Sequence, residues 1–396
     1  MILVPRDKID DYVASGWWGE ETIGALLLAT ARRQPDAPAV ADPPNAAQVS
    51  GRPARAWTWG RLLREVGRMA AFLHAQGLRK DDVLVAQLPN GVDQHALYLA
   101  CACTGIVVTP VPVQYRGHEL AHVVGSTGAR VAITTERVGQ HPIAQAWADH
   151  FGGTLQVWSF GHSLPAGVHA LDAALEGCVP WTAEAIEAHM AAIGLTAHDV
   201  LTICWTSGTE ARPKGVPRNH NEWLIVGQSV IDAGQLQPGA RMVIPFPFVN
   251  MAGISTSLAA WLMLGGELRH HHPFDLGVFI AQLRDQPTDY TVAAPAVLAM
   301  LLKQPEQLDG VDLGRLKRIG SGGGPLADWL VEQFADKFGI EVVNYFGSNE
   351  GATMSSPLSR STRRVRIFFA LDSDHSKPGT PRRGKYSVRW RRSGMS

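Results

Sequence analysis

The residues with the clearest capacity for chemistry lie in a short run that ends in Pro-Lys-Gly. Four consecutive positions in it supply hydroxyl groups or a glycine: Thr206, Ser207, Gly208 and Thr209. Short hydroxyls and exposed backbone N–H groups can surround phosphate oxygens, and glycine lets the backbone approach a ligand closely. Lys214 adds a mobile positive charge after this turn, although the spacing differs from the Walker pattern. We expect a phosphate-binding loop with Thr206 and Lys214 as candidate catalytic residues; a plain surface loop beside a core strand is the alternative.

Two later runs combine glycine, aromatic and acidic residues. The first holds four glycines within five positions: Gly320, Gly322, Gly323 and Gly324. Such a run allows the backbone to lie flat against a planar ligand, although it is also typical of an ordinary strand–helix turn. The second run holds Tyr345, Phe346, Gly347, Asn349 and Glu350. A carboxylate such as that of Glu350 can neutralise Mg²⁺ beside a polyphosphate, whereas a lone Glu on a loop is usually only solvated.

Two further runs invite a functional interpretation. A proline turn followed by an apolar helix pattern places Asn250 and Gly253 near the start of a helix, and a simple helix start is the alternative there. Farther on, the consecutive residues His270, His271 and His272 resemble a metal site. Consecutive histidines in one extended run seldom converge on one ion, and no Cys or acidic ligand stands at helical spacing. We therefore expect no metal at the histidines.

Strand and helix patterns alternate around these runs. Thr58 can cap a helix whose apolar residues recur at helical spacing: Leu62, Val66, Met69 and Leu73. Strands are expected at residues 82–88, 106–111, 129–134 and 200–205, with helices at 92–104 and 118–127. This alternation predicts parallel βαβ units and hence an α/β fold. Residues 140–190 show poor periodicity, and we expect them to form a variable connector.

Composition bounds the class of protein. The chain has 396 residues, of which 45% are hydrophobic, with 36 Lys and Arg against 36 Asp and Glu. These values fit a globular protein with a large core or two to three packed subdomains. No apolar stretch is long enough to span a membrane. The N-terminus lacks the basic segment followed by an apolar segment that is typical of a signal peptide. The four cysteines lack CxxC spacing. We expect a cytoplasmic protein with buried free thiols.

The charge is distributed unevenly. Residues 357–396 hold eleven Lys and Arg against two Asp, so the rest of the chain is acidic. A basic segment could contact nucleic-acid phosphates, but no accompanying fold or aromatic platform supports this, and we expect no nucleic-acid partner.

The three motif runs together resemble the adenylate-forming enzymes, the acyl- and aryl-CoA synthetase superfamily. The phosphate loop of that family reads Thr-Ser-Gly-Thr-Thr-Gly-x-Pro-Lys-Gly, and Glu210 and Ala211 replace two of its positions here. The glycine run is similar to the family's Gly-Gly-Ala/Gly-Pro-Leu. The third run is similar to Tyr-Gly-x-Thr-Glu, with Phe346 for Tyr and Asn349 for Thr. The resemblance implies the large N-terminal domain of the family, in which two mixed or parallel sheets are sandwiched by helices.

The resemblance also implies a role for each candidate residue. Phosphates would be held by Thr206, Ser207, Gly208, Thr209 and Lys214, with a further contact from Asn349. Adenine would be framed by Gly322, Gly323, Gly324, Tyr345, Phe346 and Gly347. The acid's tunnel would be lined by Asn250, where the family often has His, together with Gly253 and Gly322. Mg²⁺ would be bound by Glu350, which is a candidate catalytic residue together with Thr206 and Lys214.

The implied activity is that of an ATP-dependent carboxylic acid–CoA ligase with ATP, Mg²⁺ and CoA as cofactors. The acid would become acyl-AMP, and CoA would then take the acyl group as a thioester. Two alternatives stay open: an aryl-acid adenylating enzyme that loads a carrier-protein thiol, and a non-catalytic nucleotide- or acid-binding module. The resemblance names neither the acid nor the oligomeric state.

The resemblance covers an AMP-binding N-terminal domain over residues 1–356, with a boundary between two βαβ subdomains near residues 190–200. Past Pro357 it fades, and the motifs of the family's C-terminal domain do not follow. We therefore expect residues 357–396 to be a basic, atypical tail that is a truncated or out-of-frame remnant. The chain would then be an impaired form of the ligase.

Overall fold

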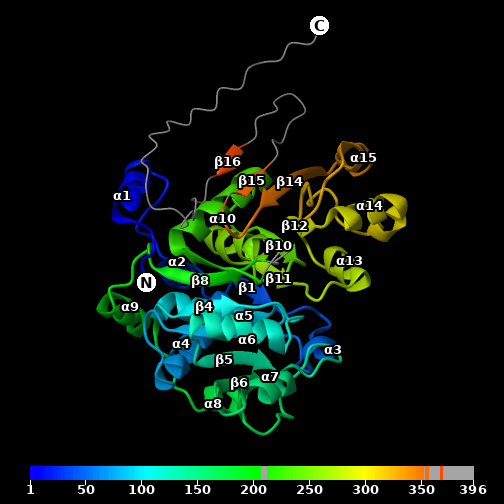
Figure 1. Ribbon diagram of the computed structural model, residues 1–396. Helices are drawn as coiled ribbons and strands as arrows, with labels where there is room; N and C mark the ends of the chain where they lie inside the picture. The colour runs from blue at the N-terminus through cyan, green and yellow to red at the C-terminus, as the bar shows by residue number, and fades with distance from the viewer. Residues whose placement is uncertain (207–211, 352, 356–365, 369–396) are drawn as a thin grey trace.

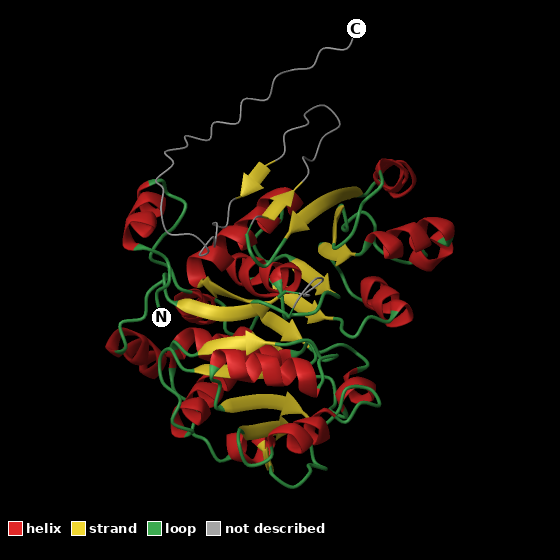
Figure 2. Cartoon of the chain, viewed as in Figure 1, coloured by secondary structure: helices red, strands yellow, loops and turns green. Residues whose placement is uncertain are grey.

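Two β-sheets and the helices around them make up the computed structural model, which describes residues 1–206, 212–351, 353–355 and 366–368 (Figure 1; Figure 2). The first sheet has seven strands in the order β7-β6-β5-β3-β4-β8-β9. The second has nine, in the order β16-β15-β14-β13-β12-β10-β11-β1-β2. All pairs in the first sheet are parallel except β8 with β9, and three pairs in the second sheet are antiparallel. The predicted α/β fold with two mixed sheets is confirmed.

The strands of the first sheet are β3 (Val83–Gln87), β4 (Val107–Pro110), β5 (Val131–Thr135), β6 (Gln156–Phe160), β7 (Val168–Ala170), β8 (Val200–Trp205) and β9 (Gly215–Asn219). Those of the second sheet are β1 (Pro38–Ala41), β2 (Ala56–Thr58), β10 (Arg241–Ile244), β11 (Glu267–His270), β12 (Tyr290–Ala293), β13 (Arg318–Gly322), β14 (Glu341–Gly347), β15 (Thr353–Ser355) and β16 (Arg366–Phe368). The chain therefore changes from one sheet to the other between residues 219 and 241, while its first two strands join the second sheet. The predicted domain division stays a prediction.

The helices of the N-terminal half are α1 (Arg6–Ala14), α2 (Ile23–Arg33), α3 (Ala46–Ser50), α4 (Trp59–Ala75), α5 (Val92–Thr104), α6 (Gly117–Thr127), α7 (Ile143–Phe151), α8 (Leu171–Glu176) and α9 (Ala183–Ala192). Those of the C-terminal half are α10 (His220–Gly234), α11 (Met251–Ile254), the π-helix η1 (Ser255–Ala260), α12 (Trp261–Leu264), α13 (Leu276–Asp285), α14 (Pro295–Lys303), the 3₁₀ helix η2 (Pro305–Leu308) and α15 (Asp328–Phe338). None of the helices in the described residues is both long and apolar enough to cross a membrane.

The best-patterned helices form where the sequence predicts them. Helix α4 begins after Thr58, whose side chain accepts a hydrogen bond from the Arg61 backbone N–H at 3.2 Å. Its predicted apolar face is buried, and α5 has the predicted bounds. The prediction of a variable connector at residues 140–190 is wrong, because α7, β6, β7, α8 and α9 lie there. Strand β7 is only three residues long and largely exposed, so no apolar alternation marked it.

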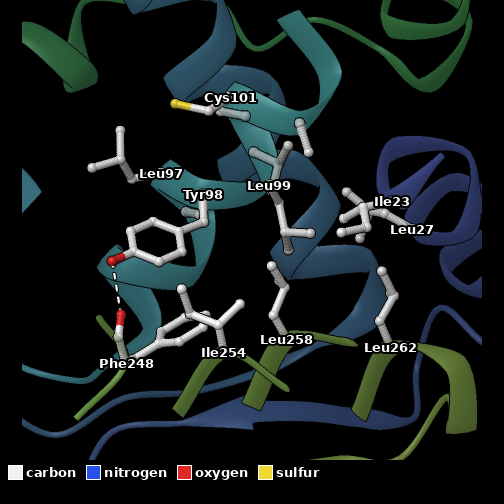
Figure 3. Packing of buried hydrophobic residues seen from close by; sticks show 14 of the residues in the cluster. Ile23, Leu27, Leu97, Tyr98, Leu99, Cys101, Phe248, Ile254, Leu258 and Leu262 are labelled. Atoms are coloured by element: carbon white, nitrogen blue, oxygen red, sulfur yellow. Dashed lines mark hydrogen bonds between the residues drawn. The ribbon is translucent and has the colours of Figure 1, made fainter. Parts of the chain in front are cut away.

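One hydrophobic cluster joins the two sheets. Figure 3 shows Ile254, Leu258 and Leu262 of the α11–η1–α12 helix facing side chains of α2 and α5. In the same view the Tyr98 hydroxyl donates a hydrogen bond to the Phe248 carbonyl at 2.8 Å. The shared core holds the helix that follows Asn250 in a defined position relative to both sheets.

The consecutive histidines are buried in this interior. His95 Nε2 lies 2.8 Å from the Ser257 carbonyl oxygen and must donate, which leaves His95 Nδ1 to accept from His270 Nε2 at 2.8 Å. His271 Nδ1 lies 2.7 Å from Gln282 Oε1. Within the described ranges no group of three or more His, Cys, Asp or Glu side chains is placed to hold a metal ion. His270 and His271 therefore bond to polar groups of the core.

Candidate active site

A cavity of about 870 Å³ lies between the ends of strands from both sheets. Its lining includes members of all three motif runs: Thr206 and Lys214, then Gly322 and Gly323, then Tyr345, Phe346, Gly347, Asn349 and Glu350. Asn250, Met251, Ala252, Ser255 and Thr256 line it as well. Segments that are far apart in the sequence thus meet around one space.

The residues at the two ends of the predicted phosphate loop form hydrogen bonds with each other. Strand β8 is buried and pairs with β4 and β9, so it ends at a defined place at the cavity. The Thr206 N–H donates to the Lys214 carbonyl at 3.0 Å, and the Lys214 N–H donates to Thr206 Oγ1 at 3.2 Å. His122 Nε2 donates to the Pro213 carbonyl at 2.8 Å and supports the Lys214 end of the same loop. The predicted residues Ser207, Gly208 and Thr209 lie outside the described residues.

The glycine run lets two strands approach closely at the cavity wall. A Cβ atom at Gly322 would lie 2.8 Å from the Tyr345 carbonyl oxygen, so only glycine fits where β13 packs on β14. Gly323 has a φ of +81°, in the left-handed region that favours glycine. Both residues line the cavity, whereas Gly324 does not. The wall between β13 and β14 is therefore flat backbone at Gly322 and Gly323.

Neighbouring side chains on β14 point to opposite sides, as strand geometry requires. The Tyr345 hydroxyl lies 3.2 Å from the Tyr290 hydroxyl and donates to the Val230 carbonyl at 3.4 Å. Burial raises the pKa of Tyr345 above its ordinary value, so this phenol stays neutral. Phe346 keeps 61% of its surface exposed and presents its ring to the cavity. An exposed ring beside flat backbone suits the stacking of a planar base.

Asn349 joins three elements at the phosphate end of the cavity. Its Nδ2 donates to the Trp205 carbonyl of β8 at 2.9 Å, and its Oδ1 accepts from the Met251 N–H of α11 at 2.9 Å. One Nδ2 hydrogen is left over for the phosphate contact that the sequence predicts. Glu350 follows, exposed and lining the cavity. Asn349 thereby fixes the loop that carries the candidate metal ligand.

Asn250 and Gly253 have different roles in the helix start. Asn250 lines the cavity, and its Oδ1 accepts from the Gly253 N–H at 3.4 Å as the N-cap of α11. Gly253 lies outside the cavity lining, and a Cβ atom there would lie 1.9 Å from the Pro247 carbonyl oxygen. Close packing against Pro247 therefore accounts for glycine at this position, and the predicted place of Gly253 in the tunnel wall stays a prediction.

Comparison with known proteins identifies the family. The sequence model described as "AMP-binding enzyme" matches residues 27–381, which include all three motif runs. The chain belongs to the AMP-binding enzyme family. It is 27% identical to a feruloyl-CoA synthase from an Amycolatopsis species over 319 residues, which cover 80% of this chain and 59% of that relative. It is 25% identical to the sulfoacetate–CoA ligase of Cupriavidus necator over 350 residues, covering 87% and 63%.

Solved structures share the fold of this chain. The inhibitor-bound N-terminal domain of FACL13 from Mycobacterium tuberculosis matches with a TM-score of 0.68 at 23% identity, covering 83% of this chain and 76% of that one. A benzoate CoA ligase from Burkholderia xenovorans LB400 matches with a TM-score of 0.70 at 14% identity, covering 87% and 64%. The chain thus has the large-domain fold of AMP-binding enzymes, and it spans less than two thirds of the length of the curated relatives named above.

The sequence analysis missed part of the cavity lining. Four lining residues follow Asn250 along one helix: Met251, Ala252, Ser255 and Thr256. Their spacing of one, three and one is that of a single helix face, so helical periodicity counted from Asn250 could have found them. Arg212 and Trp205 also line the cavity and flank the predicted phosphate loop. Arg218 lies outside the cavity lining but donates hydrogen bonds to the Asn349 and Gly351 carbonyls beside Glu350. Its only sequence signal is a charged residue in a strand pattern, three residues after Pro-Lys-Gly.

Proposed function

We propose that the chain carries the acid-activating chemistry of an ATP-dependent carboxylic acid–CoA ligase. The observation that carries the proposal is the meeting of all three motif runs around one cavity, next to a helix that supplies uncharged lining. Family membership supports a ligase of this class, because the two curated relatives above are named for joining acids to CoA. A carboxylate oxygen of the acid would attack the α-phosphorus of ATP, and pyrophosphate would leave with the bonding electron pair.

Each part of the cavity would act on one part of the substrates. Lys214 and Arg212 would bind phosphate oxygens as negative charge builds on the leaving pyrophosphate. Gly322, Gly323 and Phe346 would enclose adenine and exclude water from one side of the nucleotide. The sulfur of CoA would then attack the acyl carbonyl carbon, and AMP would leave. A carrier-protein thiol, the alternative acceptor, would use the same acyl-AMP, so the choice of acceptor is a separate question for experiment.

Glu350 fits the Mg²⁺ that the resemblance implies. It is an exposed carboxylate in the cavity lining, and its side chain makes no ion pair with another described residue. Mg²⁺ is commonly held by one or two carboxylates together with substrate phosphates and water. When bound, the ion neutralises polyphosphate charge. Glu350 would hold it beside the phosphates near Lys214.

The lining supports an acid with one carboxylate and an apolar body. Among the described residues that line the cavity, the charged ones are Arg212, Lys214 and Glu350, all within the motif runs. The remaining wall is apolar at Val230, Phe246, Met251, Ala252 and Val292. The Thr256 hydroxyl on the same wall donates to the Ala252 carbonyl at 3.0 Å, so it needs no polar partner from a substrate. A second anionic group on the acid would lack a cation there, and its burial would cost free energy.

Pyrophosphate exchange with a panel of acids tests the proposal. We expect exchange with aromatic or aliphatic monocarboxylates, weaker exchange with sulfoacetate, and a loss of about 10²–10³-fold in rate for Lys214→Gln. Lys303→Gln, on the exposed side of α14, is the matched control and should retain the rate. Nucleotide binding without exchange for any acid would favour the non-catalytic module instead. Thioester formation with CoA and with a carrier-protein thiol, measured separately, decides the acceptor.

A further inference from the structure

Arg218 is a buried arginine directly behind the loop that carries Glu350. It lies in β9 with 2% of its surface exposed. Its Nε donates to the Asn349 carbonyl at 3.1 Å, and its Nη2 donates to the Asn349 carbonyl at 2.8 Å and to the Gly351 carbonyl at 3.1 Å. The guanidinium therefore binds the backbone carbonyls of the residues before and after Glu350.

Arg218 lacks the carboxylate ion-pair partner that a buried arginine normally has. Among the described residues no carboxylate oxygen lies within ion-pair distance of Arg218, and its buried Nη1 has no hydrogen-bond partner. Glu222 and Glu350 are close enough only for longer-range attraction. Its guanidinium carbon lies 5.6 Å from the centre of the Trp223 ring, which adds a cation–π contact. Burying a charge without an ion pair costs free energy, so the carbonyl contacts and the ring must offset that cost.

The loop that carries Glu350 also forms hydrogen bonds through the Asn349 side chain. The Asn349 side chain ties it to the Trp205 carbonyl and to the Met251 N–H at the start of α11. The Glu350 side chain itself makes no hydrogen bond to another described residue, so its position depends on the backbone around it. Arg218 lies in β9, the strand that follows the phosphate loop. It thereby connects this strand to the backbone around Glu350.

We propose that Arg218 is a positioning residue that holds Glu350 for metal–nucleotide binding and places an unpaired positive charge behind the phosphate end of the cavity. The inference rests on the proposed function, because it assigns Glu350 to the metal that accompanies ATP. It predicts that the loss of Arg218 raises the Mg²⁺ concentration needed for nucleotide binding. A purely structural role would lower thermal stability and leave the Mg²⁺ requirement unchanged.

The test measures binding of a non-hydrolysable ATP analogue by calorimetry at graded Mg²⁺ concentrations. Arg218→Gln removes the charge and the forked donor, and we expect the half-saturating Mg²⁺ concentration to rise about tenfold. Arg218→Lys keeps a charge but cannot donate to two carbonyls in the same way, so we expect a smaller rise. The matched control is Arg318→Gln in β13, which removes an arginine paired with Glu341 at 3.0 Å outside the cavity lining. It should leave the Mg²⁺ requirement unchanged.

The outcomes separate this inference from the proposed function. A folded Arg218→Gln variant with the wild-type Mg²⁺ requirement overturns the positioning role. Should that variant not fold, Arg218→Lys decides in its place: an unchanged requirement overturns the inference and a raised one supports it. Wild-type protein that binds no Mg²⁺–nucleotide overturns the proposed function itself and the inference with it.

Discussion

Phe346 is a large apolar residue whose side chain is exposed at the cavity. It is 61% exposed although it is large and apolar, and it lies beside the flat backbone of Gly322 and Gly323 in the cavity wall. Its neighbour Tyr345 faces the interior and bonds to Val230 and Tyr290. Both residues line the cavity, but the Tyr345 hydroxyl is bonded within the interior whereas the Phe346 ring is exposed.

Replacing Phe346 should weaken nucleotide binding without unfolding the protein. We expect Phe346→Ala to raise the KM for ATP about five- to tenfold, because stacking of one aromatic ring contributes about 0.5–1.5 kcal/mol beyond its buried area. Phe346→Tyr should keep most of the affinity, and the melting temperature should change little because the ring is exposed. Trp329→Ala, at a residue that is 53% exposed on α15 and outside the lining, is the control. Equal ATP affinity in Phe346→Ala and wild type would contradict stacking.

At the scale of elements, the α11–η1–α12 helix connects the cavity to the core. One face supplies Met251, Ala252, Ser255 and Thr256 to the cavity, and another packs Leu258 and Leu262 into the shared core (Figure 3). Its middle turn is π-helical, a form that occurs mostly in short pieces and often at functional sites. The position of this helix depends on the tight turn before it.

Gly253→Ala should destabilise that turn. A Cβ atom there would lie 1.9 Å from the Pro247 carbonyl oxygen and 3.0 Å from Phe248 Cα, and neither backbone atom can move freely. We expect a loss of about 1–3 kcal/mol in the free energy of unfolding, as for other overpacked sites, measured by urea titration. Gly324→Ala is the matched control, because a Cβ atom there meets nothing within 4 Å. Equal urea midpoints for the two variants would show that the turn relaxes.

At the scale of the whole molecule, both sheets contribute to one core. The same hydrophobic cluster contains Leu84 and Leu201 of the first sheet and Met242, Leu268 and Val292 of the second. The buried pair of His95 and His270 lies in this interior, linking α5 to β11. The sheets therefore depend on each other for the burial of their inner faces.

This shared core predicts that the two sheets unfold together. Urea titrations followed by far-ultraviolet circular dichroism and by tryptophan fluorescence should coincide in one transition. Leu258→Ala, at a fully buried position, should lower both midpoints equally and reduce the free energy of unfolding by about 2–5 kcal/mol. Two separate transitions, or a shift seen by only one probe, would mean that the sheets form independent units.

The buried histidines predict a loss of stability in acid. Burial lowers the pKa of His95 from 6.5 to about 4 and that of His270 well below its ordinary value. Between these values the folded state binds fewer protons than the unfolded state, so the free energy of unfolding falls as the pH drops from about 6.5 towards 4. The slope is about 1.4 kcal/mol per pH unit for each such histidine.

Urea midpoints at pH 7, 5.5 and 4.5, each about one unit or more apart, measure this slope. His95→Gln should make the slope shallower, because one protonation linked to unfolding is removed. His162→Gln, at an exposed histidine, should leave the slope as in wild type. Identical slopes in His95→Gln and wild type would contradict the linkage of His95 to folding.

Local patterns in the sequence were sufficient for the fold class, and the motif runs indicated most of the residues that line the candidate site. The helix face at Leu62, Val66, Met69 and Leu73, the bounds of α5 and the strand before Thr206 follow from periodicity and capping, which depend on neighbours in the chain. The three motif runs likewise indicated candidate site residues, because the chemistry of a glycine, a hydroxyl or an acidic side chain follows from the residue type alone. Of these residues, Thr206, Lys214, Gly322, Phe346 and Glu350 line one cavity.

Only the tertiary structure decided the features that depend on contacts between distant segments. The pairing of β1 with β11 and the bond between His95 and His270 each join parts of the chain that no local pattern relates. The same holds for Arg218, whose partners at Asn349 and Gly351 lie more than a hundred residues away. Side-chain type specifies what a residue can do, whereas packing and hydrogen bonding across the fold decide which partner it meets.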